Sequence, residues 1–178
     1  MKKFLLFAAL MMLAVPALSQ DIGVYFDPEG MNPNLSYEAY APGYGPFSTI
    51  DAYVIGYAEA LIGGGAFKLE VTPNILPINP VYPDGINAGN LVDGVEIAIT
   101  EAVVAYYHQP VVLCSMEILF LSVGNLDEIQ VLPHPSYETV VLAEASGALI
   151  PATGFTSALT PLVDNDQESW GQVKSLFQ

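Results

Sequence analysis

Apolar and polar residues alternate along much of this chain, a pattern typical of strands that bury one face. In GAFKLEVT, residues 65–72, Phe67, Leu69 and Val71 share one face, and polar side chains share the other. Shorter runs with the same period predict further strands at 22–26, 48–60, 94–100, 102–107, 110–122, 128–132 and 138–144. Period-two alternation is far commoner here than helical spacing, so the chain is predicted to be mostly β.

Glycine, proline, asparagine and aspartate punctuate these runs. Residues 27–30, Asp-Pro-Glu-Gly, have the preferred chemistry of a type I turn, and residues 31–47 are predicted to form a loop. The glycines at 63–65 are expected to end the strand before them. Prolines interrupt residues 74–83, which predicts an edge or crossover strand, and residues 84–90 are predicted to be a turn.

Seven to nine strands without intervening helices predict an all-β fold, an antiparallel β-sandwich, because a sheet with one apolar face must cover it with another. A sheet closed on itself is the alternative arrangement. Residues 20–144 are predicted to form the sandwich, and residues 145–163 a linker or last strand. Residues 164–178 place Trp170 and other apolar side chains at helical spacing, which predicts a short amphipathic helix that docks on its own domain or on another protein.

The first 19 residues have the features of an export signal. Lys2 and Lys3 precede an apolar run of 12 residues, and Ala17-Leu18-Ser19 supplies small residues before Gln20. A membrane-spanning helix needs about 20 apolar residues, so this run is too short, and no later stretch is apolar enough. The mature protein is therefore expected to be secreted or periplasmic, without a membrane span.

Removal of this signal leaves 2 lysines against 19 acidic residues, a net charge of −17. Such a surface excludes nucleic acid as a partner, because binding phosphates requires Lys or Arg. Hydrophobic residues make up 52% of the chain, enough for an ordinary core. The single cysteine rules out an internal disulfide, so the stability of the domain must come from packing.

The residues offer little support for catalysis. Cys114 is predicted to face the core, and about 20 Å of extended chain separates it from His108. His134 lies in a proline-rich loop, and no zinc spacing, nucleophile elbow or phosphate loop is present. The chain is predicted not to be an enzyme. The alternative is a carboxylate-dependent glycoside hydrolase, for which Glu117, within an apolar strand, is the most interesting acid.

Aromatic residues in one loop are candidates for binding. Tyr37, Tyr40, Tyr44 and Phe47 stand among proline and glycine in SYEAYAPGYGPF. Such rings stack on sugars or anchor protein interfaces, and Trp170 in the predicted helix is a further candidate. The alternative is that this loop folds back over the edge of the sandwich. No cofactor is required, and the expected partner is a protein or a glycan.

A calcium site is the one metal site that the residues suggest. Asp84, Asn87, Asn90 and Asp93 supply oxygen donors in a glycine-rich stretch, as Ca²⁺ prefers. Residues 164–166, Asp-Asn-Asp, form a second cluster. Neither has the spacing of an EF-hand, and solvated turns are the alternative interpretation.

Three segments together resemble cohesin-like domains of the immunoglobulin-like sandwich class: AYVIGYAEA, GAFKLEVTPNILPI and, much later, PVVLCSMEILFLSV. The resemblance spans roughly residues 22–143, and DIGVYFDPEG and ESWGQVKSLF resemble the two ends of exported bacterial proteins. It implies a non-catalytic sandwich that binds a protein or glycan at the cell surface or in the periplasm. Cohesins bind dockerin modules through one sheet face.

Overall fold

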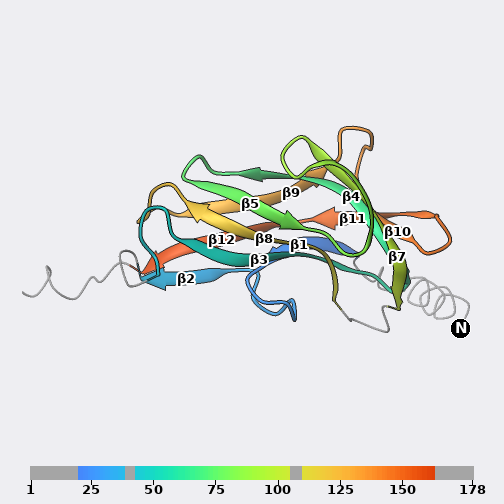
Figure 1. Ribbon diagram of the computed structural model, residues 1–178, viewed down its shortest axis with the longest axis horizontal. Helices are drawn as coiled ribbons and strands as arrows, with labels where there is room; N and C mark the ends of the chain where they lie inside the picture. The colour runs from blue at the N-terminus through green and yellow to red at the C-terminus, as the bar shows by residue number, and fades with distance from the viewer. Residues whose placement is uncertain (1–19, 39–42, 105–109, 163–178) are drawn as a thin grey trace, which may run out of the picture.

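The computed structural model describes residues 20–38, 43–104 and 110–162, and these fold into two packed layers of β-strands (Figure 1). The all-β prediction is confirmed, with twelve described strands rather than seven to nine. They are β1 (Asp21–Tyr25), β2 (Leu35–Glu38), β3 (Thr49–Tyr57), β4 (Leu61–Val71), β5 (Ile75–Val81), β6 (Gly85–Asn90), β7 (Gly94–Val104), β8 (Val111–Phe120), β9 (Asp127–Pro133), β10 (Val140–Glu144), β11 (Leu149–Gly154) and β12 (Thr156–Leu162).

One layer has the strand order β1-β3-β8-β5, and all of its pairs are antiparallel. In the other layer β4 is central, pairing with β9 in one part of its length and lying between β7 and β10 in another. β11 joins the layers, because it pairs antiparallel with β10 and parallel with β1. Within the described residues, β2, β5 and β6 each have one paired side, so the described strands form an open sandwich and not a sheet closed on itself.

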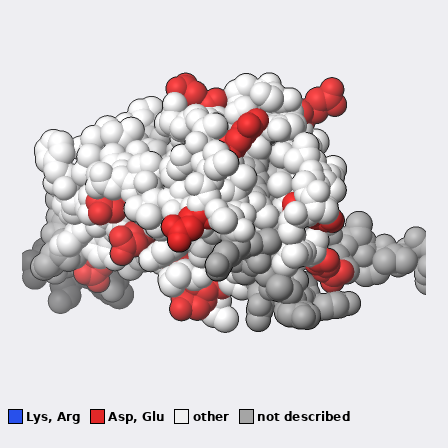
Figure 2. Space-filling model, turned by 45° about the vertical axis from the view of Figure 1, so that its right-hand side comes forward, with Lys and Arg blue, Asp and Glu red and all other residues white. Residues whose placement is uncertain are grey.

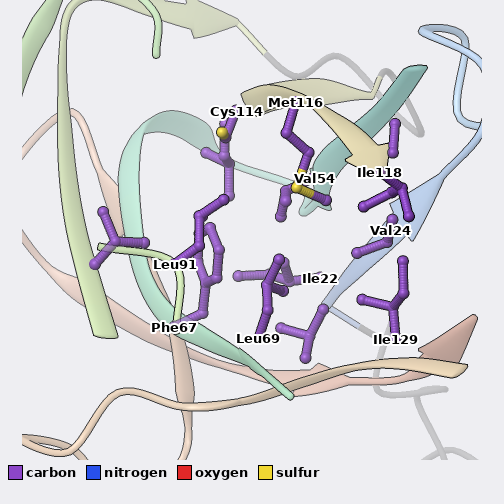
Figure 3. Packing of buried hydrophobic residues seen from close by; sticks show 14 of the residues in the cluster. Ile22, Val24, Val54, Phe67, Leu69, Leu91, Cys114, Met116, Ile118 and Ile129 are labelled. Atoms are coloured by element: carbon purple, nitrogen blue, oxygen red, sulfur yellow. The ribbon is translucent and has the colours of Figure 1, made fainter. Parts of the chain in front are cut away.

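The core lies between the layers and follows the alternation in the sequence (Figure 3). Phe67 and Leu69 of β4 point toward Ile22 of β1 and Val54 of β3 in Figure 3, and all four are at most 2% exposed. On β8 the inward side chains include Cys114, as the sequence predicted. Each large side chain buried in this way contributes about 1.5–3 kcal/mol to the free energy of folding. This packing, and no disulfide, stabilises the domain.

The alternation on β8 fails at one place. Val111 and Leu113 should share the outer face with Ser115, yet both are buried, and Val112 between them is only half-buried. The register between β3 and β8 shifts at Val54 and Ile55, where Val54 pairs with Cys114 and Ile55 pairs with Val112. A bulge of this kind breaks the two-residue period, so Leu113 turns into the core beside Cys114.

Two segments predicted to be irregular are strands. Residues 31–47 were expected to be a loop, but β2 lies within them, pairs in parallel with β12, and buries Tyr37. Residues 84–90 were expected to be a turn, but they include β6, which pairs with β7 along its whole length. The backbone bonding of a partner strand overrides weak local strand propensity in both cases.

The glycines at 63–65 continue β4 instead of ending a strand. Glycine here lets β4 lie close to β7: a Cβ on Gly64 would lie 1.9 Å from the Ile97 carbonyl oxygen of β7. Residues 145–162 contain β11 and β12, so the strands of the sandwich continue to Leu162. No helix that could span a bilayer occurs in the described parts of the chain. The predicted signal and C-terminal helix lie outside the described residues.

A buried carboxylate ties one end of the sandwich together. Asp127, at the start of β9, is fully buried. Its Oδ1 accepts hydrogen bonds from Thr72 Oγ1 at 2.7 Å and Asn74 Nδ2 at 3.1 Å. Asn74 Oδ1 accepts in turn from Ser122 Oγ at 3.0 Å, so the β4–β5 turn and the end of β8 are joined to β9. Buried polar groups require such partners; Oδ1 has them, whereas Oδ2 is buried with none among the described residues.

We expect Asp127→Ala to lower the free energy of unfolding by about 2 kcal/mol, because it leaves the half-buried donors of Thr72 and Asn74 without their acceptor. Urea denaturation followed by tyrosine and tryptophan fluorescence measures the change. The neighbouring Glu128→Ala is the control, because Glu128 is exposed and its loss should cost less than about 0.5 kcal/mol. Equal effects of the two substitutions would show that the Asp127 network does not contribute to stability.

Candidate functional site

A shallow apolar groove lies on the outer face of the layer that contains β4. Its volume is about 230 Å³, and it crosses β6, β7, β4, β10 and β11. It is lined by Gly65, Ala66, Ile86, Ala88, Glu96, Ile97, Ala98, Tyr137, Val141, Ala143 and Leu149. Side chains from segments far apart in the sequence therefore form one continuous surface.

The strand register explains why this face is hollow. On the central strands the outward positions are occupied by glycine and alanine: Gly64 pairs with Ala98 on one side and with Ala143 on the other. At the margins the side chains are larger, with Ile86 on β6 exposed by 76% and Leu149 on β11 exposed by 52%. Small residues in the middle and larger ones at both sides produce a trough with apolar walls.

Polar groups gather at one end of the groove. Glu96 faces outward on β7, and its Oε1 lies 3.8 Å from His134 Nδ1. The same carboxylate raises the pKa of the Tyr137 hydroxyl, chiefly by its negative charge. His134 Nδ1 accepts a hydrogen bond from the Ser136 N–H at 3.1 Å, which holds the turn that carries Tyr137. The groove thus combines an apolar trough with one acidic end.

The charge of the surrounding surface has one sign. Lys68 is the only lysine or arginine in the described parts of the chain. Figure 2 shows Asp and Glu scattered over one face of the molecule, with neither Lys nor Arg in view. Complementary potentials favour association, so a macromolecular partner of this surface would present basic groups.

This geometry fits the side chains of another macromolecule better than a small molecule. Pockets for small molecules are usually about 300–1,000 Å³ and enclose their ligand, whereas this groove is smaller and open. Contiguous exposed apolar surface with a polar margin is a mark of protein interfaces. Because its floor is rigid sheet, the groove is preorganised for an apolar ridge.

The aromatic residues selected from the sequence lie elsewhere. Tyr37 is buried, with its ring 5.6 Å from that of Tyr44 and 5.1 Å from that of Phe120. Its ring therefore packs in the core instead of presenting a face to a sugar. Phe47 is 75% exposed at a positive φ of 67°, and a binding role for it stays a prediction. Tyr40 and Trp170 lie outside the described residues.

The predicted calcium ligands are divided between the two ends of β6. Asn90 Oδ1 accepts from the N–H groups of Val92 and Asp93, and Asn90 Nδ2 donates to Asp93 Oδ2 at 2.8 Å. These bonds close the turn between β6 and β7. Asp84 lies at the other end of β6, about 20 Å away at the usual rise of a strand, and Asn87 lies between them. Calcium binding by these residues stays a prediction.

The described acids contain one facing pair. Asp51 on β3 pairs with Glu117 on β8, beside a hollow of about 210 Å³, and Asn79 Nδ2 donates to Glu117 Oε2 at 3.3 Å. Asp51 is exposed and Glu117 is half-buried, so water reaches both carboxylates. A glycoside hydrolase needs one acid that is protonated near neutral pH by desolvation or a close charge. This pair has the proximity but not the shielded environment.

Sequence reasoning missed the groove altogether. Its floor is made by small residues, Ala66, Ala98 and Ala143, which carry no reactive group and come from three separate strands. The available signal was an alanine or glycine at outward positions of otherwise bulky strands, as in GGGAF and EIAIT. Recognising it as a site required the pairing of β4 with β7 and β10.

No family model matches the chain, and no curated protein is similar to it in sequence. Solved structures resemble it in fold. The non-cellulosomal cohesin of the hyperthermophilic archaeon Archaeoglobus fulgidus gives a TM-score of 0.52 at 9% identity, covering 87% of this chain and 96% of that one. The cohesin module of a family 33 glycoside hydrolase from Clostridium perfringens gives 0.54 at 7%, covering 81% and 98%.

A chain in the structure of a type I cohesin–dockerin complex from Clostridium thermocellum is similar at the same level, with a TM-score of 0.52 and 10% identity, covering 81% of this chain and 99% of that one. These similarities extend over nearly the whole length of the cohesin chains. The fold is therefore a cohesin-like β-sandwich, as the sequence resemblance predicted.

We expect Cys114 to be chemically inert in the folded protein. Burial raises the pKa of its thiol to about 12, so at pH 8 only about one thiol in ten thousand is ionised. Reaction with a chromogenic disulfide reagent should therefore be negligible in native buffer and complete in urea. A raised pKa also means that the buried thiol favours the folded state below pH 9 and loses this effect as the pH rises toward 12. Rapid native reaction would contradict the buried placement.

Proposed function

We propose that this chain is an exported, non-catalytic assembly module that binds another protein through the apolar groove. The observation that carries the proposal is the groove itself, an exposed apolar trough on one outer sheet face of a cohesin-like sandwich. A related fold occurs in a cohesin–dockerin complex from Clostridium thermocellum. An exposed apolar trough on a sheet face is suited to binding another protein.

Two features of the groove define the partner's chemistry. The floor of alanine and glycine admits an apolar ridge, and Ile86 and Leu149 flank it from β6 and β11. Glu96 at one end, and the acidic surface around it, favour a lysine or arginine next to that ridge. The buried apolar contact would supply most of the affinity, and the charged contact would supply orientation and association rate.

The other functions have weaker support from the described residues. Glycan binding through the aromatic loop would rest on Phe47 and Tyr44, because Tyr37 is buried. A carboxylate hydrolase would rest on Asp51 and Glu117, both reached by water on an open sheet face. Export, with the mature chain starting at Gln20, agrees with an assembly role at the cell envelope or outside the cell.

The first experiment is capture of partners from envelope and secreted fractions of the organism that encodes the chain. The bait is residues 20–178 and is compared with Leu149→Asp, which places a charge on the apolar wall, and with Ala143→Phe, which fills the floor. We expect each variant to reduce retention of a specific partner about tenfold or more, equal to about 1.4 kcal/mol.

Leu162→Asp is the matched control, because Leu162 is 54% exposed, close to the 52% of Leu149, but lies at the end of β12. A partner lost with the groove variants and kept by this control supports the proposal. A bait ending at residue 163 tests whether the tail docks on the partner. If every bait retains the partner equally, the groove is not the binding site, and the Phe47 loop becomes the next region to substitute.

A further inference from the structure

One end of the groove is formed by a segment that leaves the sheet. β9 and β10 lie end to end along one side of β4, because Pro133 pairs with Phe67 and Val141 pairs with the adjacent Ala66. Residues 134–139, here called the excursion, connect these two positions outside the ladder. Part of the excursion lines the groove. The chain therefore passes over the outer face between β9 and β10.

His134 holds the excursion by two hydrogen bonds. Its carbonyl oxygen accepts from the Tyr137 N–H at 2.9 Å, and its Nδ1 accepts from the Ser136 N–H at 3.1 Å. A neutral imidazole that accepts through Nδ1 carries its proton on Nε2. The ring lies against Gly94 of β7, where an added Cβ would come within 2.5 Å of His134 Cδ2. The bond from Ser136 thus sets the tautomer, and Gly94 leaves room for the ring.

The same ring nitrogen faces the acid of the groove. Glu96 Oε1 lies 3.8 Å from His134 Nδ1, and the two side chains are 47% and 15% exposed. While Nδ1 carries no proton it has nothing to donate, so the carboxylate stays available to an outside cation. A proton on Nδ1 turns this nitrogen into a donor with Glu96 in reach and removes the acceptor of the Ser136 N–H. The two protonation states of one nitrogen therefore have different partners.

The other ionisable groups near His134 do not take the place of Glu96. The Tyr137 hydroxyl, whose pKa is raised chiefly by the negative charge of Glu96, stays neutral in mild acid. The next charged residues on the surrounding elements form no ion pair with His134 within 4 Å in the described parts of the chain. These are Lys68 on β4, Asp93 in the β6–β7 turn and Glu138 in the excursion.

We propose that His134 makes the acidic end of the groove a pH-dependent subsite for a guanidinium or ammonium group of the partner. At neutral pH the imidazole bonds to Ser136 and leaves Glu96 to the cation. Below about pH 6, where histidines usually become charged, the Nδ1–H donates to Glu96 and occupies the place of the cation. The ligand of this subsite rests on the proposed function, whereas the exchange of partners by His134 does not.

The effect on affinity is a modulation. Exposed ion pairs change an equilibrium by up to about fivefold. The apolar floor at Ala98 and Ala143 does not titrate, so its contribution to binding is the same at both pH values. A basic partner is therefore held less tightly in mild acid but is not excluded from the groove.

NMR on isotope-labelled residues 20–178 between pH 8 and pH 5 tests the exchange of partners without any ligand. We expect the Ser136 N–H and the Glu96 carboxyl carbon to shift with the midpoint of the His134 imidazole. The protection of the Ser136 N–H from hydrogen exchange should fall about fivefold as its acceptor is lost.

His134→Asn is the matched variant, because the asparagine Oδ1 accepts a hydrogen bond as Nδ1 does and does not titrate. It should keep the Ser136 bond at every pH and remove the shift of Glu96 between pH 8 and pH 5. His108→Asn removes the only other histidine and should leave the response unchanged.

Butylguanidinium, which has the chemistry of an arginine side chain, tests the subsite. Detected at the Glu96 carboxyl carbon, it should bind about threefold more tightly at pH 7.5 than at pH 5.5, and equally at both in His134→Asn. Resonances that do not follow His134, or equal binding at both pH values in the wild type, overturn the proposal. The groove variants Leu149→Asp and Ala143→Phe leave His134 and Glu96 in place, so they test the proposed function separately.

Discussion

The burial of two apolar sheet faces against each other is the interaction on which the rest of this structure depends. With one cysteine and no disulfide, the chain has no covalent means of holding its layers together. Phe67, Leu113 and Ile118 are fully buried between them. Since side chains alternate along a strand, fixing the inward set also fixes which residues face outward. The groove is thus the outer side of the same strands that form the core.

Strands that carry bulky alternating residues could be predicted from the sequence. β4 and β8 are the clearest, and the inward position of Cys114 followed from their period. β6, β11 and β12 were harder to predict, because alanine, glycine, asparagine and proline carry little strand signal. β2 has only four residues, too few to show a period. Their extended form depends on a neighbour, β7 for β6 and β12 for β2. The bulge that buries Leu113 likewise depends on the pairing of β8 with β3.

The site was less predictable than the fold, for a physical reason. The sequence draws attention to side chains with functional groups, such as Tyr37, but the ring of Tyr37 is buried in the core beside Phe120. The groove arises instead from missing bulk at Ala66, Ala98 and Ala143, and its shape exists only once β4, β7 and β10 are side by side. Such a site is a property of the topology: the small outward residues in GGGAF and EIAIT can be read from the sequence, but only the pairing of the strands brings them together.

The floor and the margin of the groove differ in how freely their residues can be substituted. The floor is constrained by the close packing of strands, since even one added carbon at Gly64 would meet a backbone oxygen of β7. The margin, at Ile86 and Leu149, is exposed, and substitutions at exposed positions usually change stability by less than about 0.5 kcal/mol. Under the proposed function, the margin could therefore change to suit another partner while the packing of the strands keeps the floor constant.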